Sequence, residues 1–157
     1  MPTISILYVE DNLLRSLVNS AVIREGGFDV VEVYCAAEAV AVIERHAPLG
    51  ALVTDINLGS GADGFEVSRC ARAAYPAIPV IYVSAAAAAR IPLEGVEGAQ
   101  FIAKPFHPWQ IVEALDRLVH LEAILASDHA SRAPRGAARP MPSARVALEP
   151  LAAGAPS

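Results

Sequence analysis

Short apolar runs alternate along the chain with longer stretches of mixed polarity. Most residues in the runs are Val, Ile, Leu or aromatic, and polar, Gly or Pro residues flank them. Runs of this kind are typical of β-strands that are covered on both faces. We therefore predict five strands, over residues 4–9, 28–33, 51–54, 79–83 and 101–103.

The stretches between the strands carry apolar residues every three or four positions, which is the spacing of one helix face. A first helix is expected to end at Gly26–Gly27 and a second to span 36–47, before Pro48. A third follows the glycine-rich loop 59–64, and the last spans 108–125. The apolar positions are Leu14, Leu17, Val18, Ala21 and Val22 in the first helix, Val67, Cys70, Ala71 and Ala74 in the third, and Ile111, Leu115, Leu118 and Leu125, expected to face inward, in the last.

The stretch 85–98, where a fourth helix is due, departs from this spacing. Pro92 lies inside it, and Gly95 and Gly98 follow. Proline in a helix interior removes a hydrogen bond and costs about 3 kcal/mol. The fourth helix is therefore predicted to be short or degenerate.

Strands that alternate with helices indicate an α/β fold with a parallel sheet covered on two sides. Five such units predict a flavodoxin-like, doubly wound, five-stranded parallel sheet. We assign residues 1–126 to this domain. Residues 127–157 are rich in Pro, Ala and Arg, and we predict a disordered tail there because the prolines interrupt any helix.

Composition excludes several classes of protein. No apolar run approaches the roughly 20 residues of a membrane span, and no cationic segment precedes an apolar one at the N-terminus. We expect a cytoplasmic protein with no membrane partner. Cys35 and Cys70 lack metal-site spacing, and we predict that both are buried free thiols.

Charge is distributed unevenly along the chain. Residues 1–126 carry 8 basic and 15 acidic side chains, a net charge of -7, which argues against direct binding of nucleic acid. Of the 12 basic residues in the chain, 11 are Arg, and Lys104 is the single Lys. Because Lys offers a compact point charge that Arg does not, Lys104 is a candidate functional residue.

Polar side chains follow four of the predicted strands. Glu10 and Asp11 follow the first, Asp55 the third, Ser84 the fourth and Lys104 the fifth. In an open parallel sheet, ligands bind beyond the carboxyl ends of the strands. We therefore expect three carboxylates, a hydroxyl and an amine to share one edge of the sheet.

This set of groups suits phosphoryl acceptance. Crowded carboxylates repel one another, and Mg²⁺, which prefers oxygen ligands and phosphate oxygens, relieves that repulsion. A carboxylate can attack phosphorus to give an aspartyl phosphate. The step needs mainly positioning and cancellation of negative charge, which Mg²⁺, Lys104 and Ser84 could supply.

Four segments, ILYVEDN (6–12), VTDIN (53–57), VSA (83–85) and FIAKPF (101–106), resemble the receiver domain of bacterial response regulators. The resemblance covers residues 4–125. It implies that Asp55 is the phosphoacceptor and that Lys104 pairs with the phosphoryl group. It also implies Mg²⁺ ligands at Glu10, Asp11, Asp55 and the backbone carbonyl of Asn57, a cis peptide before Pro105, and a switch formed by Ser84 and Phe101.

The resemblance also implies partners. The phosphodonor would be a sensor histidine kinase or a histidine phosphotransfer protein, and the chain would signal to an unknown protein target or relay the phosphoryl group onward. A homodimer is possible on sequence grounds. No enzymatic turnover is expected beyond slow self-catalysed phosphorylation and dephosphorylation. The loop after Asp55 lacks the Met-Pro pair frequent in the family, and Phe101 has no hydroxyl for a tyrosine-type switch.

Three other functions are compatible with parts of the sequence. A pseudo-receiver would keep the pocket but act as a protein-interaction module without phosphorylation. A dehalogenase-type phosphatase would use an aspartyl intermediate, but its DxDxT motif follows the first strand, unlike Asp55. Residues 59–64 match the GxGxxG dinucleotide pattern. That fingerprint requires its first glycine directly after the strand and an acidic residue about 20 positions further on. Here residues 55–58 separate the glycines from the strand, and the region near Ser84 has no acidic residue.

Overall fold

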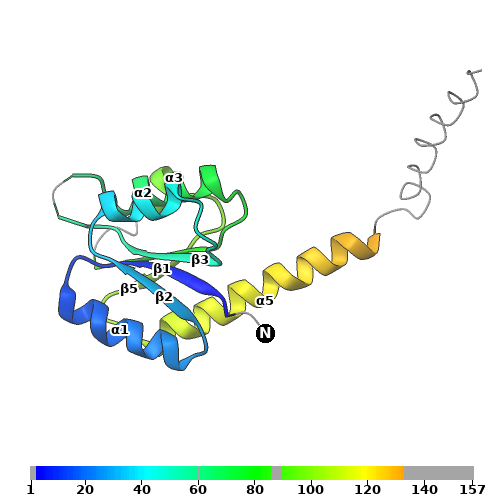
Figure 1. The fold of residues 1–157 in the computed structure, drawn as a ribbon, viewed down its shortest axis with the longest axis horizontal. Coiled ribbons are helices and arrows are strands. Elements are labelled where there is room, and N and C mark those ends of the chain that lie inside the picture. The colour runs from blue at the N-terminus through cyan, green and yellow to red at the C-terminus, as the bar shows by residue number, and fades with distance from the viewer. Residues whose placement is uncertain (1–2, 60, 86–89, 133–157) are drawn as a thin grey trace, which may run out of the picture. The chain divides into compact units, whose positions relative to one another are not determined.

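The computed structural model describes residues 3–59, 61–85 and 90–132 (Figure 1). The chain divides into two units between His120 and Leu121, and the whole sheet lies in the first. The strands are β1 (Ser5–Val9), β2 (Asp29–Val33), β3 (Ala51–Asp55), β4 (Val80–Ser84) and β5 (Gln100–Ala103). The helices are α1 (Leu13–Glu25), α2 (Ala36–Glu44), α3 (Gly64–Ala74), α4 (Ile91–Glu94) and α5 (Trp109–Arg132).

All five strands are parallel and lie in the order β2-β1-β3-β4-β5. Helices α2 and α3 cover one face of the sheet, and α1 with the first part of α5 covers the other (Figure 1). Each face has its own apolar core, one around Leu52, Phe65 and Tyr82 and the other around Ile6, Ile81 and Ile111. The predicted five-stranded doubly wound sheet is therefore confirmed.

Helix α3 begins directly behind the end of β3. Asp63 caps it by accepting hydrogen bonds from the backbone N–H groups of Phe65 and Glu66, at 3.0 and 3.1 Å. A Cβ on Gly64 would lie 2.2 Å from the backbone oxygen of Asp55. Glycine is thus required where the helix meets the strand, and this contact fixes the backbone around Asp55.

Helix α1 turns its apolar stripe away from the sheet. Leu14, Leu17 and Val18 are 49–69% exposed, whereas Ser16, Asn19, Ser20 and Ile23 are buried. Polar contacts hold the buried side: Ser16 Oγ donates to Glu32 on β2 at 3.1 Å, and Asn19 Nδ2 donates to the Tyr8 hydroxyl on β1 at 2.7 Å. The helical spacing was predicted correctly, but apolar spacing alone does not identify this buried face.

Several expected boundaries need correction. Helix α2 ends at Glu44 rather than near 47, with His46 in the left-handed region at φ 55°. Helix α5 ends at Arg132 rather than near 125, so residues 127–132, assigned to the disordered tail, are helical. Leu125, expected to face inward, is 46% exposed. The remaining tail, 133–157, lies outside the described residues.

The fourth helix is short, as predicted. Helix α4 has four residues and carries Pro92 in its first turn, where a missing N–H costs no helical hydrogen bond. Cys35 and Cys70 are free thiols as expected, but both are half-buried rather than buried. Among the described residues, no helix has the length and apolarity needed to span a membrane.

Candidate functional site

The strand register brings the expected residues to one edge of the sheet. Val9 pairs with Thr54, so Glu10 and Asp55 follow at the same level on neighbouring strands. Ser84 pairs with Ala103, so Lys104 lies one step beyond it on the outer strand. Two backbone hydrogen bonds continue the strand pairing into the site. Glu10 N–H donates to Val33 O at 3.2 Å, and Lys104 N–H donates to Ser84 O at 3.0 Å.

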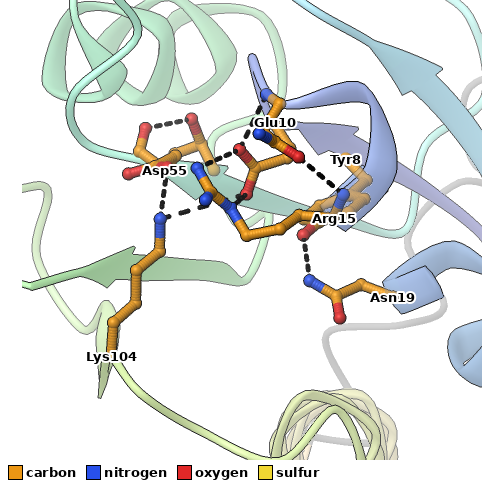
Figure 2. Close-up of polar contacts among 8 residues, drawn as sticks. Tyr8, Glu10, Arg15, Asn19, Asp55 and Lys104 are labelled. Carbon is orange, nitrogen blue, oxygen red and sulfur yellow. Dashed lines mark hydrogen bonds and ion pairs between the residues drawn. The ribbon is translucent and has the colours of Figure 1, made fainter. Parts of the chain in front are cut away.

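Asp55 and Lys104 form the shortest ion pair of the site. Lys104 Nζ lies 2.7 Å from Asp55 Oδ2 and 4.0 Å from Glu10 Oε1 (Figure 2). Asp55 is only 4% exposed, so its charge is poorly solvated and depends on this partner. The single lysine of the chain therefore points at the carboxylate expected to accept the phosphoryl group.

Glu10 is 1% exposed and accepts hydrogen bonds from two directions. The Asn12 N–H donates to Oε2 at 3.0 Å. Arg15 donates from Nε to Oε1 at 3.3 Å and from Nη2 to Oε2 at 3.2 Å, so its guanidinium spans both oxygens (Figure 2). This network fixes the first carboxylate of the site.

Glu10, Asp11 and Asp55 form a cluster that fits a hard divalent cation. Each offers a carboxylate oxygen, and these oxygens lie within 4.8 Å of one another. Two oxygens bound to one Mg²⁺ at about 2.1 Å lie roughly 3–4 Å apart. The three carboxylates therefore match magnesium in ligand type. Their oxygens would need to move only slightly closer together to bind one ion.

The remaining predicted residues lie around this cluster. Ser84 is buried at the end of β4, and Asn57 is exposed in the loop that follows β3. Phe101 is half-buried on β5 beside Tyr82 and packs against the core on the α2–α3 side. The peptide before Pro105 is cis, as predicted. The roles assigned to Ser84, Phe101 and the Asn57 carbonyl remain predictions.

Sequence reasoning missed Arg15 and the pair formed by Tyr8 and Asn19. Tyr8 lies on β1 beneath the site, and burial, with a smaller contribution from the charges of Glu10 and Asp55, raises the pKa of its phenol well above 10. One signal for Arg15 was available: a cation in the first turn of a helix opposes the helix dipole. The partner of Asn19 lies on a strand 11 residues away, and no local pattern indicates it.

An apolar groove adjoins the carboxylates. It has a volume of about 610 Å³ and is lined by Leu14, Arg15, Val18, Asn19, Ala85, Lys104, Pro105 and Phe106. Arg15 and Lys104, whose nitrogens contact Glu10 and Asp55, form part of its wall. The polar site and the exposed stripe of α1 therefore share one continuous surface.

Residues 6–116 match the family model of the response regulator receiver domain. The chain belongs to this family. The match includes all of the site residues described above. A search of curated protein sequences gave no significant match.

Solved receiver domains share this fold. The response regulator receiver protein from Sinorhizobium medicae WSM419 is 30% identical, with a TM-score of 0.73, and the alignment covers 75% of this receiver chain and 95% of that one. The receiver domain of sensor histidine kinase PA1611 from Pseudomonas aeruginosa PAO1 is 28% identical, with a TM-score of 0.66 and coverages of 76% and 99%. That structure has a magnesium ion coordinated in its active site cleft.

Proposed function

We propose that this receiver domain accepts a phosphoryl group on Asp55 from the phosphohistidine of a sensor kinase or phosphotransfer protein. The observation that carries the proposal is the 2.7 Å pair between Asp55 and the only lysine, set beside two further carboxylates. Family membership supports it, because the site residues lie within the matched residues 6–116. Turnover is limited to slow self-catalysed gain and loss of the phosphoryl group.

The chemical step needs little from the chain beyond position and charge. An oxygen of Asp55 forms a bond to phosphorus while the bond from phosphorus to the donor nitrogen breaks, and that nitrogen keeps the electron pair. Lys104 then pairs with the phosphoryl oxygens in place of the carboxylate oxygen. Ser84 donates a hydrogen bond to the same group, and Phe101 follows it inward.

Glu10, Asp11, Asp55 and the Asn57 carbonyl would hold Mg²⁺. When bound, the ion offsets negative charge on the phosphoryl oxygens. The spacing of the three carboxylates and the magnesium found in the P. aeruginosa receiver support this assignment. Without the ion, the phosphoryl group would meet the carboxylates of Glu10 and Asp11, although Arg15 offsets part of the Glu10 charge.

We expect the phosphodonor to bind the outer face of α1 and the adjoining groove. Asp55 is buried, and the groove whose wall includes Lys104, its ion-pair partner, offers a donor histidine an approach to it. That side continues into Leu14, Val18 and Phe106, which offer apolar area for a protein partner. The free cysteines fit a reducing cytoplasm, and signalling proceeds through contacts with protein targets.

Incubation with a small acyl phosphate and Mg²⁺, followed by intact-mass measurement, tests the function. We expect the mass gain of one phosphoryl group in the natural chain and none in Asp55→Asn. Asp29→Asn removes an exposed carboxylate at the opposite end of the sheet and serves as the matched control. Equal labelling of Asp55→Asn would disprove the acceptor. No labelling of the natural chain would favour a phosphorylation-independent interaction module.

A further inference from the structure

Arg15 forms a salt bridge with Glu10, one of the three carboxylates of the proposed magnesium site. Its guanidinium contacts both oxygens of Glu10, at 3.3 and 3.2 Å, and Figure 2 shows it lying alongside that side chain. The Glu10 side chain is 2% exposed, whereas the Arg15 side chain is 50% exposed. Two-point pairing of this kind adds geometric specificity to a charge-assisted contact, and here both distances exceed the roughly 2.7–2.9 Å of the strongest such bonds.

The position of Arg15 is unfavourable for the helix itself. It is the third residue of α1, in a first turn that contains no acidic residue. The positive end of the helix dipole disfavours a cation there. Glu10 offsets this cost. Accordingly, the pKa of the Arg15 guanidinium is raised, first by its hydrogen bond to Glu10 and further by the charges of Glu10, Asp55 and Asp11.

The same oxygens cannot serve two cations equally well. Glu10 Oε2 already accepts from Asn12 N–H and Arg15 Nη2, and Oε1 accepts from Arg15 Nε. Glu10 is also one of three residues whose oxygens lie close enough to share a metal ion. A cation that takes Glu10 as a ligand must therefore share these oxygens with Arg15 or displace it.

We propose that Arg15 competes with Mg²⁺ for Glu10 and thereby sets the magnesium affinity of the receiver. Binding of the ion would weaken the contact between the guanidinium and Glu10, or break it, because both cations draw on the same two oxygens. Release is feasible because half of the Arg15 side chain faces solvent. The proposal rests on the proposed function in one respect only, that the carboxylate cluster binds Mg²⁺; it does not depend on phosphorylation.

Magnesium titration of the full chain, followed by amide NMR shifts at matched ionic strength, tests the competition. Arg15→Gln removes the salt bridge to Glu10, and we expect Mg²⁺ to bind about three- to tenfold more tightly. This is the range expected when charge-assisted hydrogen bonds that are partly exposed are lost. Arg15→Lys keeps the positive charge but loses the two-point contact, so the magnesium affinity of this variant should lie between those of the natural chain and of Arg15→Gln. Arg24→Gln is the matched control: it lies on the same helix and pairs with Glu32 outside the site. It should change the dissociation constant less than twofold.

A double-mutant cycle separates direct competition from the effect of net charge. In a Glu10→Gln background, Arg15 has no carboxylate to hold, so Arg15→Gln should no longer tighten binding. An equal gain in both backgrounds, with Arg15→Lys like the natural chain, would overturn the proposal in favour of long-range charge. If the natural chain binds no Mg²⁺ at the cluster, the metal site of the proposed function fails and the competition with it. If it binds but Arg15→Gln changes nothing, only the competition fails.

Discussion

Lys104 shows how residue usage alone can indicate a functional position. It is the only lysine in a chain that otherwise uses arginine, and its Nζ lies 2.7 Å from Asp55 Oδ2. An ammonium is compact enough to follow a phosphoryl oxygen, whereas a guanidinium is a rigid planar fork. Lys104 was therefore predictable. The place of Arg15 in a first helical turn was a signal, but its contact with Glu10 was not predictable, because it depends on how that turn lies against Glu10.

Replacing Lys104 should slow acceptance without abolishing it. In Lys104→Ala, the charge that forms on the phosphoryl oxygens loses its nearest cation, and removal of one such group typically costs about 10²–10³ in rate. We expect the rate of phosphoryl gain, followed by intact mass at fixed Mg²⁺, to fall by at least about tenfold. Lys104→Arg keeps the charge and should recover part of the rate. Full-rate labelling of Lys104→Ala would contradict the mechanism.

Burial of Tyr8 makes the stability of the folded domain depend on pH. Its raised pKa means that the folded chain holds the phenolic proton more tightly than the unfolded chain, whose phenol titrates near 10. The stability that this provides is complete below pH 10 and is lost as pH rises further. In denaturant titrations, the free energy of unfolding should therefore fall more steeply between pH 10 and 11 in the natural chain than in Tyr8→Phe. Equal slopes would show that Tyr8 does not contribute.

At the scale of the element, sequence spacing predicted the five strands and the helices well. Apolar runs and strand ends are local features, so the carboxyl edge of the sheet could be located from the chain alone. The buried face of α1 could not, because Ser16 and Asn19 are held by Glu32 and Tyr8 on distant strands. Helix α5 ran longer than expected because no proline interrupts it before Pro134.

The outer stripe of α1 should govern transfer from a protein donor but not from a small molecule. Leu14→Ser and Val18→Ser alter groove-lining residues that are exposed and lie outside the core. With a phosphorylated histidine donor protein, we expect transfer to slow at least about fivefold, in the range of an interface residue worth about 1 kcal/mol. Labelling by an acyl phosphate should remain unchanged, which serves as the internal control. A parallel loss with both donors would indicate damage to the site instead.

At the scale of the whole molecule, metal binding and folding should be linked. A ligand that binds only the native state stabilises it by RT ln(1 + [L]/Kd), about 2.7 kcal/mol at 100 times Kd. Mg²⁺ should therefore raise the free energy of unfolding of the natural chain, and a chelator should reverse the gain. Asp11→Asn removes a proposed ligand and should lose most of the shift, while Asp29→Asn should retain it. Stabilisation that survives in Asp11→Asn would place the ion elsewhere.

The two sides of α1 differ in what they contact: one packs on the sheet, and the other is exposed beside the groove. Its buried side is held against the sheet partly by the hydroxyl of Ser16 and the amide of Asn19, whereas the leucines on its outer side are exposed and lie outside the core. Those positions can change from one gene copy to another while the fold and the acidic cradle persist. Duplicated receivers could in this way acquire different protein partners while they keep the same carboxylate cluster.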